Sequence, residues 1–535
     1  MTAQELMAQA HVPSGTGQVV ADQSEVAAFL AEPGAHGPGV RRVERIDTHG
    51  AMVFLAGARA YKVKRAVRFP YMDFSTLALR RAACEREVAL NRRTAPELYL
   101  GAQPIARGPD GRLSIGGEGE AVEWVVVMRR FDEGGLCDRL ARAGKLTAEI
   151  MQALADEIAA FHGAAERLAG AAAAGGGSAG LKAVIEENAA ELAERPDLFP
   201  GDALTALAEA AERALCRVHS LLDERLAKGF VRRCHGDLHL RNICVIEGRP
   251  TIFDAIEFND AIACIDVLYD LAFLLMDLDH RGLRAYGNLV LNRYLQRRDD
   301  IAGLAALPVF LSARAAVRAK VNVSMAARQS EPDAARRLTD EARRYFQAAR
   351  TYLEPAPPRL VAIGGLSGTG KTSLARRLAP GLGAPPGALH LRSDVLRKAR
   401  FGIAELTRLP PEAYTPQASR KVYADLAHHA WTGLAAGRAV IVDAVYAGPE
   451  ERAAIEALAR DFGVPFTGLW LEAPEETLLG RVAGRTGDAS DATPGVVRRQ
   501  FAYCLGAIAW HRLDATAPLE AVAEASERIL ASACD

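Results

Sequence analysis

The residues with the clearest chemical meaning form a glycine-rich loop in the last third of the chain, Gly365-Leu-Ser-Gly-Thr-Gly-Lys-Thr372. The loop follows the strand-like run 359–363 and precedes the helical run 373–378, the setting in which a GxxxxGK[ST] loop binds phosphate. Glycines let backbone N–H groups turn towards phosphate oxygens, the lysine supplies a positive charge, and the threonine hydroxyl is a ligand for Mg²⁺. Only nine of the 65 basic residues are Lys, so a lysine in this motif is informative. The pattern predicts a site for ATP and Mg²⁺ formed by Gly365, Ser367, Gly368, Thr369, Gly370, Lys371 and Thr372.

Two acids are predicted to lie beside this loop. Asp443 ends the strand-like run 439–443, which suits an acid that orders the shell of Mg²⁺ around the phosphates. Because Asp443 is followed by Ala444 and not by Glu, the pattern favours phosphoryl transfer over the ATP hydrolysis of a motor protein. Asp394 follows another strand-like run, so it should lie at the carboxyl end of a strand, where ligands of open α/β sheets gather. The alternative is that Asp394 only caps a helix that starts at Val395.

The order of these residues resembles the P-loop small-molecule and polynucleotide kinases, which place an Asp, and an Arg three residues later, after their second strand. The resemblance implies that Asp394 is the general base and that Arg397 clamps the substrate. The run 481–491 resembles the arginine-bearing lid of such kinases, which implies that Arg481 and Arg485 close over the γ-phosphate of ATP. In a chain this rich in Arg, the alternative is a solvated helix face.

A second motif precedes the first by about 130 residues: Cys234-His-Gly-Asp-Leu-His-Leu-Arg-Asn242, followed by Phe253-Asp254. It resembles the catalytic segment of the superfamily of aminoglycoside phosphotransferases and protein kinases. The resemblance implies that Asp237 accepts the proton of a substrate hydroxyl, and that Asn242 and Asp254 bind Mg²⁺. His235 is then expected to brace the loop, and Asp266 and Asp270 to hold it from a buried helix start.

The same resemblance requires an upstream lysine for the phosphates and a glutamate that positions it. Lys62 and Glu87 are the predicted pair, with Lys64 and Glu85 as alternatives because the register of the strand and helix is open. The other interpretation is that these are surface residues of an edge strand and an amphipathic helix. The strand-like run 123–130 resembles the hinge that holds adenine in this superfamily.

Three prolines in Glu354-Pro-Ala-Pro-Pro358 divide the chain, because they cannot continue the preceding helix. The predicted fold is multidomain. A loose arm (1–25) precedes a two-lobed, protein-kinase-like α+β domain (26–353), with its N-lobe at about 40–131 and a helical C-lobe at about 132–350. The linker (354–358) leads to an α/β P-loop kinase domain with a parallel sheet (359–535). This combination is similar to bacterial bifunctional proteins that join an aminoglycoside phosphotransferase-like domain to a P-loop ATP-binding domain.

The Ala/Gly-rich run 163–180 is predicted to be a mobile loop or a linker between helices.

Composition narrows the function further. The 65 basic and 66 acidic residues of the 535 leave a net charge near −1, which argues against a general nucleic-acid binder. The eight cysteines include no CxxC pair, and the apolar run 267–276 is too short to span a bilayer. These features predict a cytoplasmic protein that acts on small molecules without a membrane, and they leave its oligomeric state open.

The sequence therefore predicts a bifunctional, ATP- and Mg²⁺-dependent phosphotransferase acting on hydroxyls of small molecules such as sugars or amino sugars. Two alternatives stay open. The first is a P-loop kinase regulated by a catalytically silent nucleotide-binding module, because the N-lobe lacks a GxGxxG loop and Asp254 is followed by Ala-Ile-Glu257. The second is a polynucleotide 5′-hydroxyl kinase in the C-terminal half. The identity of either phosphate acceptor is not predicted.

Overall fold

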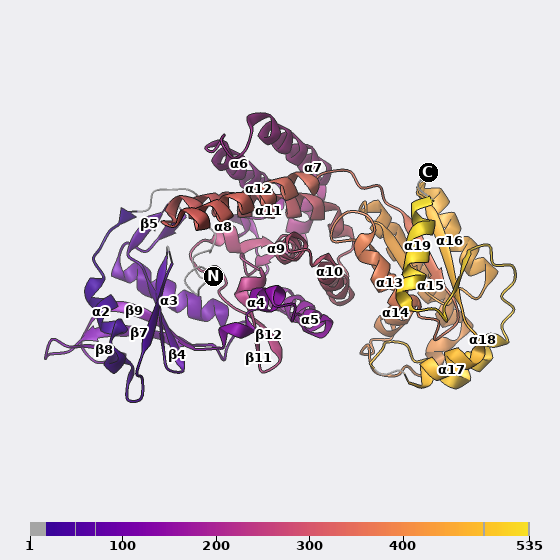
Figure 1. The fold of residues 1–535 in the computed structure, drawn as a ribbon, viewed down its shortest axis with the longest axis horizontal. Coiled ribbons are helices and arrows are strands. Elements are labelled where there is room, and N and C mark those ends of the chain that lie inside the picture. The colour runs from indigo at the N-terminus through magenta and orange to yellow at the C-terminus, as the bar shows by residue number, and fades with distance from the viewer. Residues whose placement is uncertain (1–17, 49, 70, 485–486, 533–535) are drawn as a thin grey trace. The chain divides into compact units, whose positions relative to one another are not determined.

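The computed structural model describes residues 18–48, 50–69, 71–484 and 487–532. Its internal contacts divide the chain into two units, each made from two stretches of sequence (Figure 1). The first, here called the kinase-like unit, comprises residues 1–280 and 309–353. The second, called the P-loop unit, comprises residues 281–308 and 354–535. At the proline linker the chain passes from the kinase-like unit to the P-loop unit. The segment 281–308, which the sequence predicted to be in the first domain, belongs to the P-loop unit.

The N-lobe of the kinase-like unit is a six-stranded antiparallel sheet in the order β2-β3-β4-β9-β7-β8. Side chains alternate between its two faces. On one face Val53, Leu55 and Val126 pack against α3, and on the other Phe54 and its neighbours pack against α2. The elements are β2 Val43–Asp47, β3 Ala51–Ala56, β4 Arg59–Lys64, β7 Tyr99–Arg107, β8 Leu113–Ile115, β9 Glu120–Arg129, α2 Ser24–Ala31, η1 Pro33–His36 and α3 Leu77–Asn91.

A small second sheet corrects the predicted N-terminal arm. Residues 1–17 lie outside the described part of the chain, but β1 (Gln18–Val19) pairs with β5 (Val67–Phe69), which pairs in turn with β6 (Met72–Asp73). The Gln23 amide donates to the carbonyl oxygen of Lys64 at 2.9 Å and accepts the N–H of Ala66 at 2.7 Å. Residues 18–25 are therefore attached to the N-lobe by backbone hydrogen bonds, and the prediction of a loose arm is wrong for them.

The C-lobe is mainly helical, and α9 runs through its centre with residues 267–278 all buried. Short strand pairs, β10 with β13 and β11 with β12, carry the predicted catalytic segment between the helices. The elements are η2 Glu133–Gly135, α4 Cys137–Arg142, α5 Ala148–Ala164, η3 Gly170–Ala173, α6 Gly177–Ala193, α7 Gly201–Ala227, β10 Val231–Arg233, η4 Leu240–Asn242, β11 Ile243–Ile246, β12 Arg249–Ile252, α8 Asp260–Ala263, β13 Cys264–Asp266, α9 Val267–His280, α11 Leu307–Arg328 and α12 Pro332–Thr351.

The Ala/Gly-rich run predicted to be mobile is packed. It contains η3 and the start of α6. A Cβ on Gly175 would lie 2.2 Å from the carbonyl oxygen of Ala261, and one on Gly176 would lie 2.4 Å from the side chain of Val231. The glycines are there because neighbouring backbone and side chains leave no room for a larger residue.

One helical stretch of the described residues, 302–328, is long and apolar enough to cross a membrane by length and composition alone. Within the structure, 83% of its most apolar window is buried. Burial on this scale is typical of a core helix, which passes the same test.

The P-loop unit is built on a parallel five-stranded sheet in the order β15-β16-β14-β17-β18. Helices α13 and α19 cover one face around Ile363, Leu374 and Val522, and α15 and α16 pack on the other. The elements are α10 Arg284–Arg298, η5 Ala302–Ala306, β14 Leu360–Gly364, α13 Lys371–Leu378, η6 Ala379–Gly381, β15 Leu389–Arg392, α14 Ser393–Arg400, η7 Pro411–Tyr414, α15 Pro416–Ala435, β16 Val440–Asp443, α16 Pro449–Phe462, β17 Phe466–Glu472, α17 Glu475–Ala483, α18 Pro494–Phe501, β18 His511–Asp514 and α19 Leu519–Ser532.

Candidate active sites

The glycine-rich loop connects the end of β14 to the first turn of α13. Gly365 has a φ of 139° and Gly370 a φ of 89°, values that residues with a Cβ rarely adopt. A Cβ on Gly365 would also lie 2.4 Å from the carbonyl oxygen of Leu471. The glycines therefore let the loop fold closely against β17 and lead into a helix N-terminus, the arrangement that binds phosphate oxygens.

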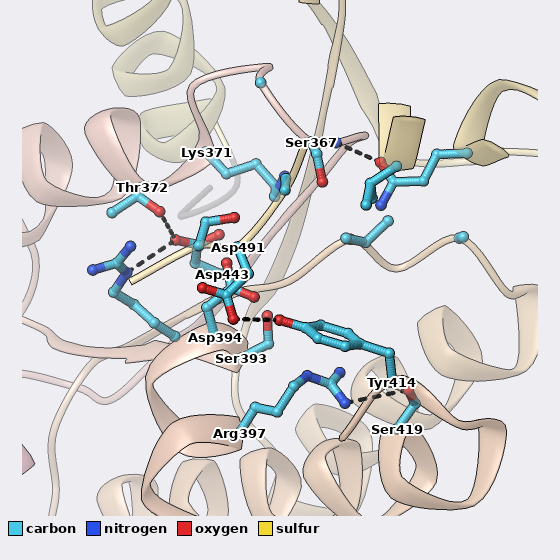
Figure 2. A pocket seen from close by; sticks show the side chains of 18 of the residues that line it. Ser367, Lys371, Thr372, Ser393, Asp394, Arg397, Tyr414, Ser419, Asp443 and Asp491 are labelled. Atoms are coloured by element: carbon cyan, nitrogen blue, oxygen red, sulfur yellow. Dashed lines mark hydrogen bonds and ion pairs between the residues drawn. The ribbon is translucent and has the colours of Figure 1, made fainter. Parts of the chain in front are cut away.

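Lys371, Thr372 and Asp443 come together at the end of this loop (Figure 2). Lys371 Nζ donates to the carbonyl oxygens of Gly365 and Leu366 at 2.8 and 3.0 Å. The Thr372 hydroxyl donates to Asp443 Oδ2 at 2.5 Å. Burial alone would raise the pKa of Asp443, but the contact with His390 and the positive charge of Lys371 lower it to about 2.

This donor set fits magnesium. Asp443 is ionised at neutral pH because of its low pKa, and its carboxylate lies beside a hydroxyl oxygen. Carboxylate and hydroxyl oxygens, together with phosphate oxygens, are the ligands that Mg²⁺ prefers. Thr372 and Asp443 are therefore the residues that would hold the ion in this unit.

Asp394 faces the same cavity, which has a volume of about 890 Å³. Figure 2 shows its carboxylate near those of Asp443 and Asp491, with Lys371 across the opening. Helix α14 begins at Ser393, so Asp394 belongs to its first turn and does not cap a helix starting at Val395. Burial raises the pKa of Asp394, against the opposing charge of Arg392. A carboxylate with a raised pKa inside a cavity is well suited to accept a proton.

The three arginines predicted for this site have different surroundings. Arg397 lines the cavity, but its Nη1 donates to the carbonyl oxygen of Ala413 at 2.6 Å, and its guanidinium lies 5.2 Å from the centre of the Tyr414 ring. It thus anchors the cavity wall around Tyr414. Arg481 is not among the described residues that line the cavity, and it donates to the carbonyl oxygen of Ala515 at 2.8 Å. Arg485 lies outside the described residues.

Sequence reasoning missed the polar contacts that close this cavity. Asp491 accepts hydrogen bonds from the Tyr414 hydroxyl and the Leu409 N–H, both at 2.8 Å, and from Lys398 Nζ at 2.9 Å. Gln500 Oε1 accepts the N–H of Ser367 at 2.8 Å, which orients the phosphate loop. The acids of the 487–491 segment were visible in the sequence, but nothing in their spacing indicated these partners.

The second site lies in the kinase-like unit and is centred on Lys62. Its Nζ lies 2.8 Å from Glu87 Oε1 and 2.7 Å from Asp254 Oδ1. Burial alone would lower the pKa of Lys62, but the two carboxylates raise it well above its usual value. Asp254 has a φ of 64°, a strained conformation for a residue with a side chain, and such strain gathers at functional sites. The predicted lysine, glutamate and metal-binding aspartate are thus brought into direct contact.

Lys64, the alternative to Lys62, takes part in the same cluster. It lies on the same face of β4 and forms ion pairs with Glu87 and with Glu257, and all three side chains are buried. Glu85, the alternative to Glu87, is exposed and pairs with Arg81. Glu257 is therefore a buried ion-pair partner of Lys64, in a cluster that also lines a pocket next to Asp254.

The catalytic loop predicted around Asp237 has the expected internal contacts. Asn242 Nδ2 donates to Asp237 Oδ2 at 2.9 Å, which leaves the side-chain oxygen Oδ1 of Asn242 for a metal. Asp237 is 2% exposed, and burial raises its pKa to about 6. His235 Nε2 lies 2.8 Å from the carbonyl oxygen of Phe253, a bracing contact. The oxygens of Asn242 and Asp254 fit Mg²⁺ and would hold it in this unit.

Asp270 supports this loop from helix α9. It accepts the N–H groups of His235 and Gly236 at 3.1 and 2.9 Å and lies 3.1 Å from His162 Nε2. Burial alone would raise the pKa of Asp270, but the contact with His162 lowers it to about 2.

Asp270→Asn should therefore lower the free energy of unfolding of the kinase-like unit by about 3 kcal/mol, because it removes a buried charge from its hydrogen-bond donors. Thermal unfolding of the full chain, followed by calorimetry, tests this. The matched control is Asp202→Asn, at an exposed position in α7, which should leave the transition unchanged. Equal melting curves for Asp270→Asn and the unmodified protein would contradict the supporting role.

A pocket with apolar walls lies next to Lys62. Apolar side chains from β3, β4 and β9, with Tyr99 and Phe253, line it, and so do residues 129–131. Its lining therefore includes the end of the run 123–130, which the sequence predicts to be the hinge. The kinase-like unit therefore has apolar walls for a base next to charged groups for phosphates.

Comparison with known proteins matches one family model to the region of each site. The family model described as "Phosphotransferase enzyme family" matches residues 54–307, and the one described as "AAA domain" matches residues 360–505. The chain belongs to the proteins that join these two domains, and it is a kinase. The resemblance predicted from the sequence is confirmed.

Two mycobacterial relatives match this chain along most of their length. Uncharacterized protein Rv2004c of Mycobacterium tuberculosis and uncharacterized protein Mb2027c of Mycobacterium bovis are each 31% identical to this chain over 479 residues. The match covers 89% of this chain and 92% of each relative.

Solved structures match each part separately. A sugar kinase from Janibacter sp. HTCC2649 is 24% identical, with a TM-score of 0.24, and the match covers 32% of this chain and 95% of that one. A choline/ethanolamine kinase family protein from Mesorhizobium loti is 16% identical, with a TM-score of 0.37, and the match covers 61% of this chain and 98% of that one.

Proposed function

We propose that the protein is a bifunctional kinase that transfers the γ-phosphate of ATP to hydroxyl groups of small molecules at two separate Mg²⁺-dependent sites. The observation that carries the proposal is that each unit has its own lysine, metal-binding oxygens and acceptor-side aspartate. In the P-loop unit these are Lys371, Thr372, Asp443 and Asp394. In the kinase-like unit they are Lys62, Asn242, Asp254 and Asp237.

In the P-loop unit, Asp394 accepts the proton of the acceptor hydroxyl as the oxygen attacks the γ-phosphorus and the bond to the leaving diphosphate oxygen breaks. Lys371 and the loop N–H groups take up negative charge on the phosphate oxygens. Thr372 and Asp443 would hold Mg²⁺, which would neutralise negative charge on the phosphates. Arg397 keeps the cavity wall in place and contributes to acceptor binding, whereas Arg481 is bonded to the carbonyl oxygen of Ala515 and does not line the cavity.

In the kinase-like unit, Asp237 takes the equivalent proton, while Asn242 orients its carboxylate through a 2.9 Å hydrogen bond. Lys62 stays protonated because of its raised pKa, and Glu87 holds it towards the phosphates. These side chains are held in place before the substrates react, so they orient the hydroxyl and the γ-phosphate. Such orientation contributes a large part of catalysis in phosphoryl transfer.

The size and charge of the P-loop cavity favour a small acceptor. Its volume of about 890 Å³ falls within the range of pockets that enclose metabolites. Acids, arginines and three tyrosines line its wall, and these polar groups can hydrogen-bond a polyhydroxylated molecule such as a sugar or amino sugar.

Incubation of the full chain with ATP, Mg²⁺ and a panel of hydroxylated metabolites, followed by mass spectrometry, tests the acceptor class. RNA and DNA with free 5′-hydroxyl ends are run in parallel. A phosphorylated sugar, amino sugar or related small molecule supports the proposal. Phosphate found only on polynucleotide ends contradicts it.

The pH dependence of the kinase-like site should report the raised pKa of Asp237. The base works only when deprotonated, so kcat/KM should rise about tenfold per pH unit below pH 6 and level off above it. The measurement uses the Asp394→Asn protein, in which only the kinase-like unit acts. A rate that is constant down to pH 4.5 would contradict the assignment of Asp237 as base.

A further inference from the structure

Helix α10 (Arg284–Arg298) precedes the proline linker and falls inside the match to the phosphotransferase family, yet it packs within the P-loop unit. It lies along β15, the strand at the edge of the parallel sheet. Two buried amides make the contact. Asn292 Oδ1 accepts the N–H of His390 at 2.7 Å, and the side chains of Asn288 and Asn292 donate to the carbonyl oxygen of Ala388 at 3.0 and 3.2 Å. The helix thus satisfies edge-strand groups that would otherwise lack partners.

This edge strand leads directly to the candidate catalytic groups. β15 ends at Arg392, and Asp394 follows two residues later. A helix that fixes the position of β15 therefore also fixes the start of α14 beside the cavity.

A row of alternating charges continues from α10 into the cavity. Arg293, next to Asn292, forms an ion pair with Glu405. Glu405 Oε1 lies 3.9 Å from Arg392 Nη1. The opposite side of the Arg392 guanidinium lies 2.6 Å from Asp488 and 3.9 Å from Asp443, the candidate metal ligand. Arg392 is 3% exposed at its side chain, so these charges are poorly screened by solvent.

We infer that Arg293 is a positioning residue of the P-loop site, acting through Glu405 on Arg392. Glu405 is shared between the two arginines, and Arg293 neutralises much of its charge. Without Arg293, the carboxylate of Glu405 keeps the positive charges of Arg376 and Arg392 as partners, and it attracts Arg392 more strongly away from Asp488 and Asp443. The metal-binding acid and the 487–491 segment then lose a positive partner. The inference rests on the proposed function, because it assumes that this cavity binds Mg²⁺ and nucleotide.

The test measures binding of a non-hydrolysable ATP analogue with Mg²⁺ by calorimetry. It uses full-length protein carrying Lys62→Ala and Asp254→Ala, so that the heat comes from the P-loop unit. Arg293→Gln should raise the Kd about 3- to 30-fold, the range found for residues that act on a site through a network. Arg293→Lys, which keeps the charge, should restore most of the affinity. Arg298→Gln, on the same helix, is the matched control and should leave the Kd unchanged.

A double-mutant cycle separates positioning from a general loss of structure. Glu405→Gln should have a smaller effect than Arg293→Gln, and the double variant should match Glu405→Gln alone, because Arg293 then has no charge to neutralise. Additive effects, or an unchanged Kd in Arg293→Gln, would overturn the inference and leave the proposed function intact. If the parent protein carrying Lys62→Ala and Asp254→Ala binds no nucleotide, the proposed P-loop site fails, and the inference fails with it.

Discussion

Asp394→Asn is expected to lower phosphoryl transfer by the P-loop unit roughly 10²- to 10⁴-fold, because the amide cannot accept the proton of the attacking hydroxyl. Binding of Mg²⁺ and nucleotide should change little, since Lys371, Thr372 and Asp443 are retained. The rate of product formation, followed by mass spectrometry at saturating ATP, gives the effect.

The matched control for this variant is Asp425→Asn in the same unit. Asp425 is half-exposed, pairs with Arg400 and lies outside the cavity lining, so its replacement should leave the rate unchanged. An undiminished rate in Asp394→Asn would show that the proton leaves by another route and that this aspartate is not the base.

Asp237→Asn should remove the second activity by a similar factor while the product of the P-loop unit continues to form. Asn242 can still hydrogen-bond to the amide, so the loop should keep its shape. The two products are measured in one reaction, which makes each site the internal control of the other. Asp202→Asn, at an exposed position of the same unit, is the control variant and should leave both products unchanged.

The result for Asp237→Asn distinguishes a protein with two active kinase sites from a P-loop kinase that is regulated by a catalytically silent kinase-like unit. If Asp237→Asn changes no product while Asp394→Asn removes all activity, the kinase-like unit acts as a nucleotide-binding module. The direct contacts among Lys62, Glu87 and Asp254 favour an active site, because they match the arrangement that phosphate binding requires.

The parts of both sites that depend on short sequence spacing could be predicted. The phosphate loop needs its glycines, lysine and threonine within eight residues, and Asp237 and Asn242 share one loop, so local sequence alone indicated them. Lys62 and Glu87 could be proposed because strand and helix periodicity limits which residues share a face. The alignment of the strand with helix α3 is known only from the structure, in which Lys62 and Lys64 lie on the α3 side of the sheet and Lys62 pairs with Glu87.

The contacts that surround these groups could not be predicted, for a physical reason. Lys64 with Glu257, and Asp491 with Tyr414, pair across long stretches of sequence, and charge alone does not select partners in a chain with 65 basic and 66 acidic residues. The position of α10 was missed for a similar reason. Its Asn288 and Asn292 side chains are buried against the carbonyl and N–H groups of an edge strand about 100 residues away, and nothing in the local sequence indicates these partners.

The number of nucleotides bound per chain tests the central claim most directly. Calorimetric titration of the full-length protein with Mg²⁺ and a non-hydrolysable ATP analogue should give two equivalents. Lys371→Ala should remove one, and Lys62→Ala combined with Asp254→Ala should remove the other. A single equivalent that is unaffected by changes at Lys62 and Asp254 would contradict the presence of a nucleotide site in the kinase-like unit.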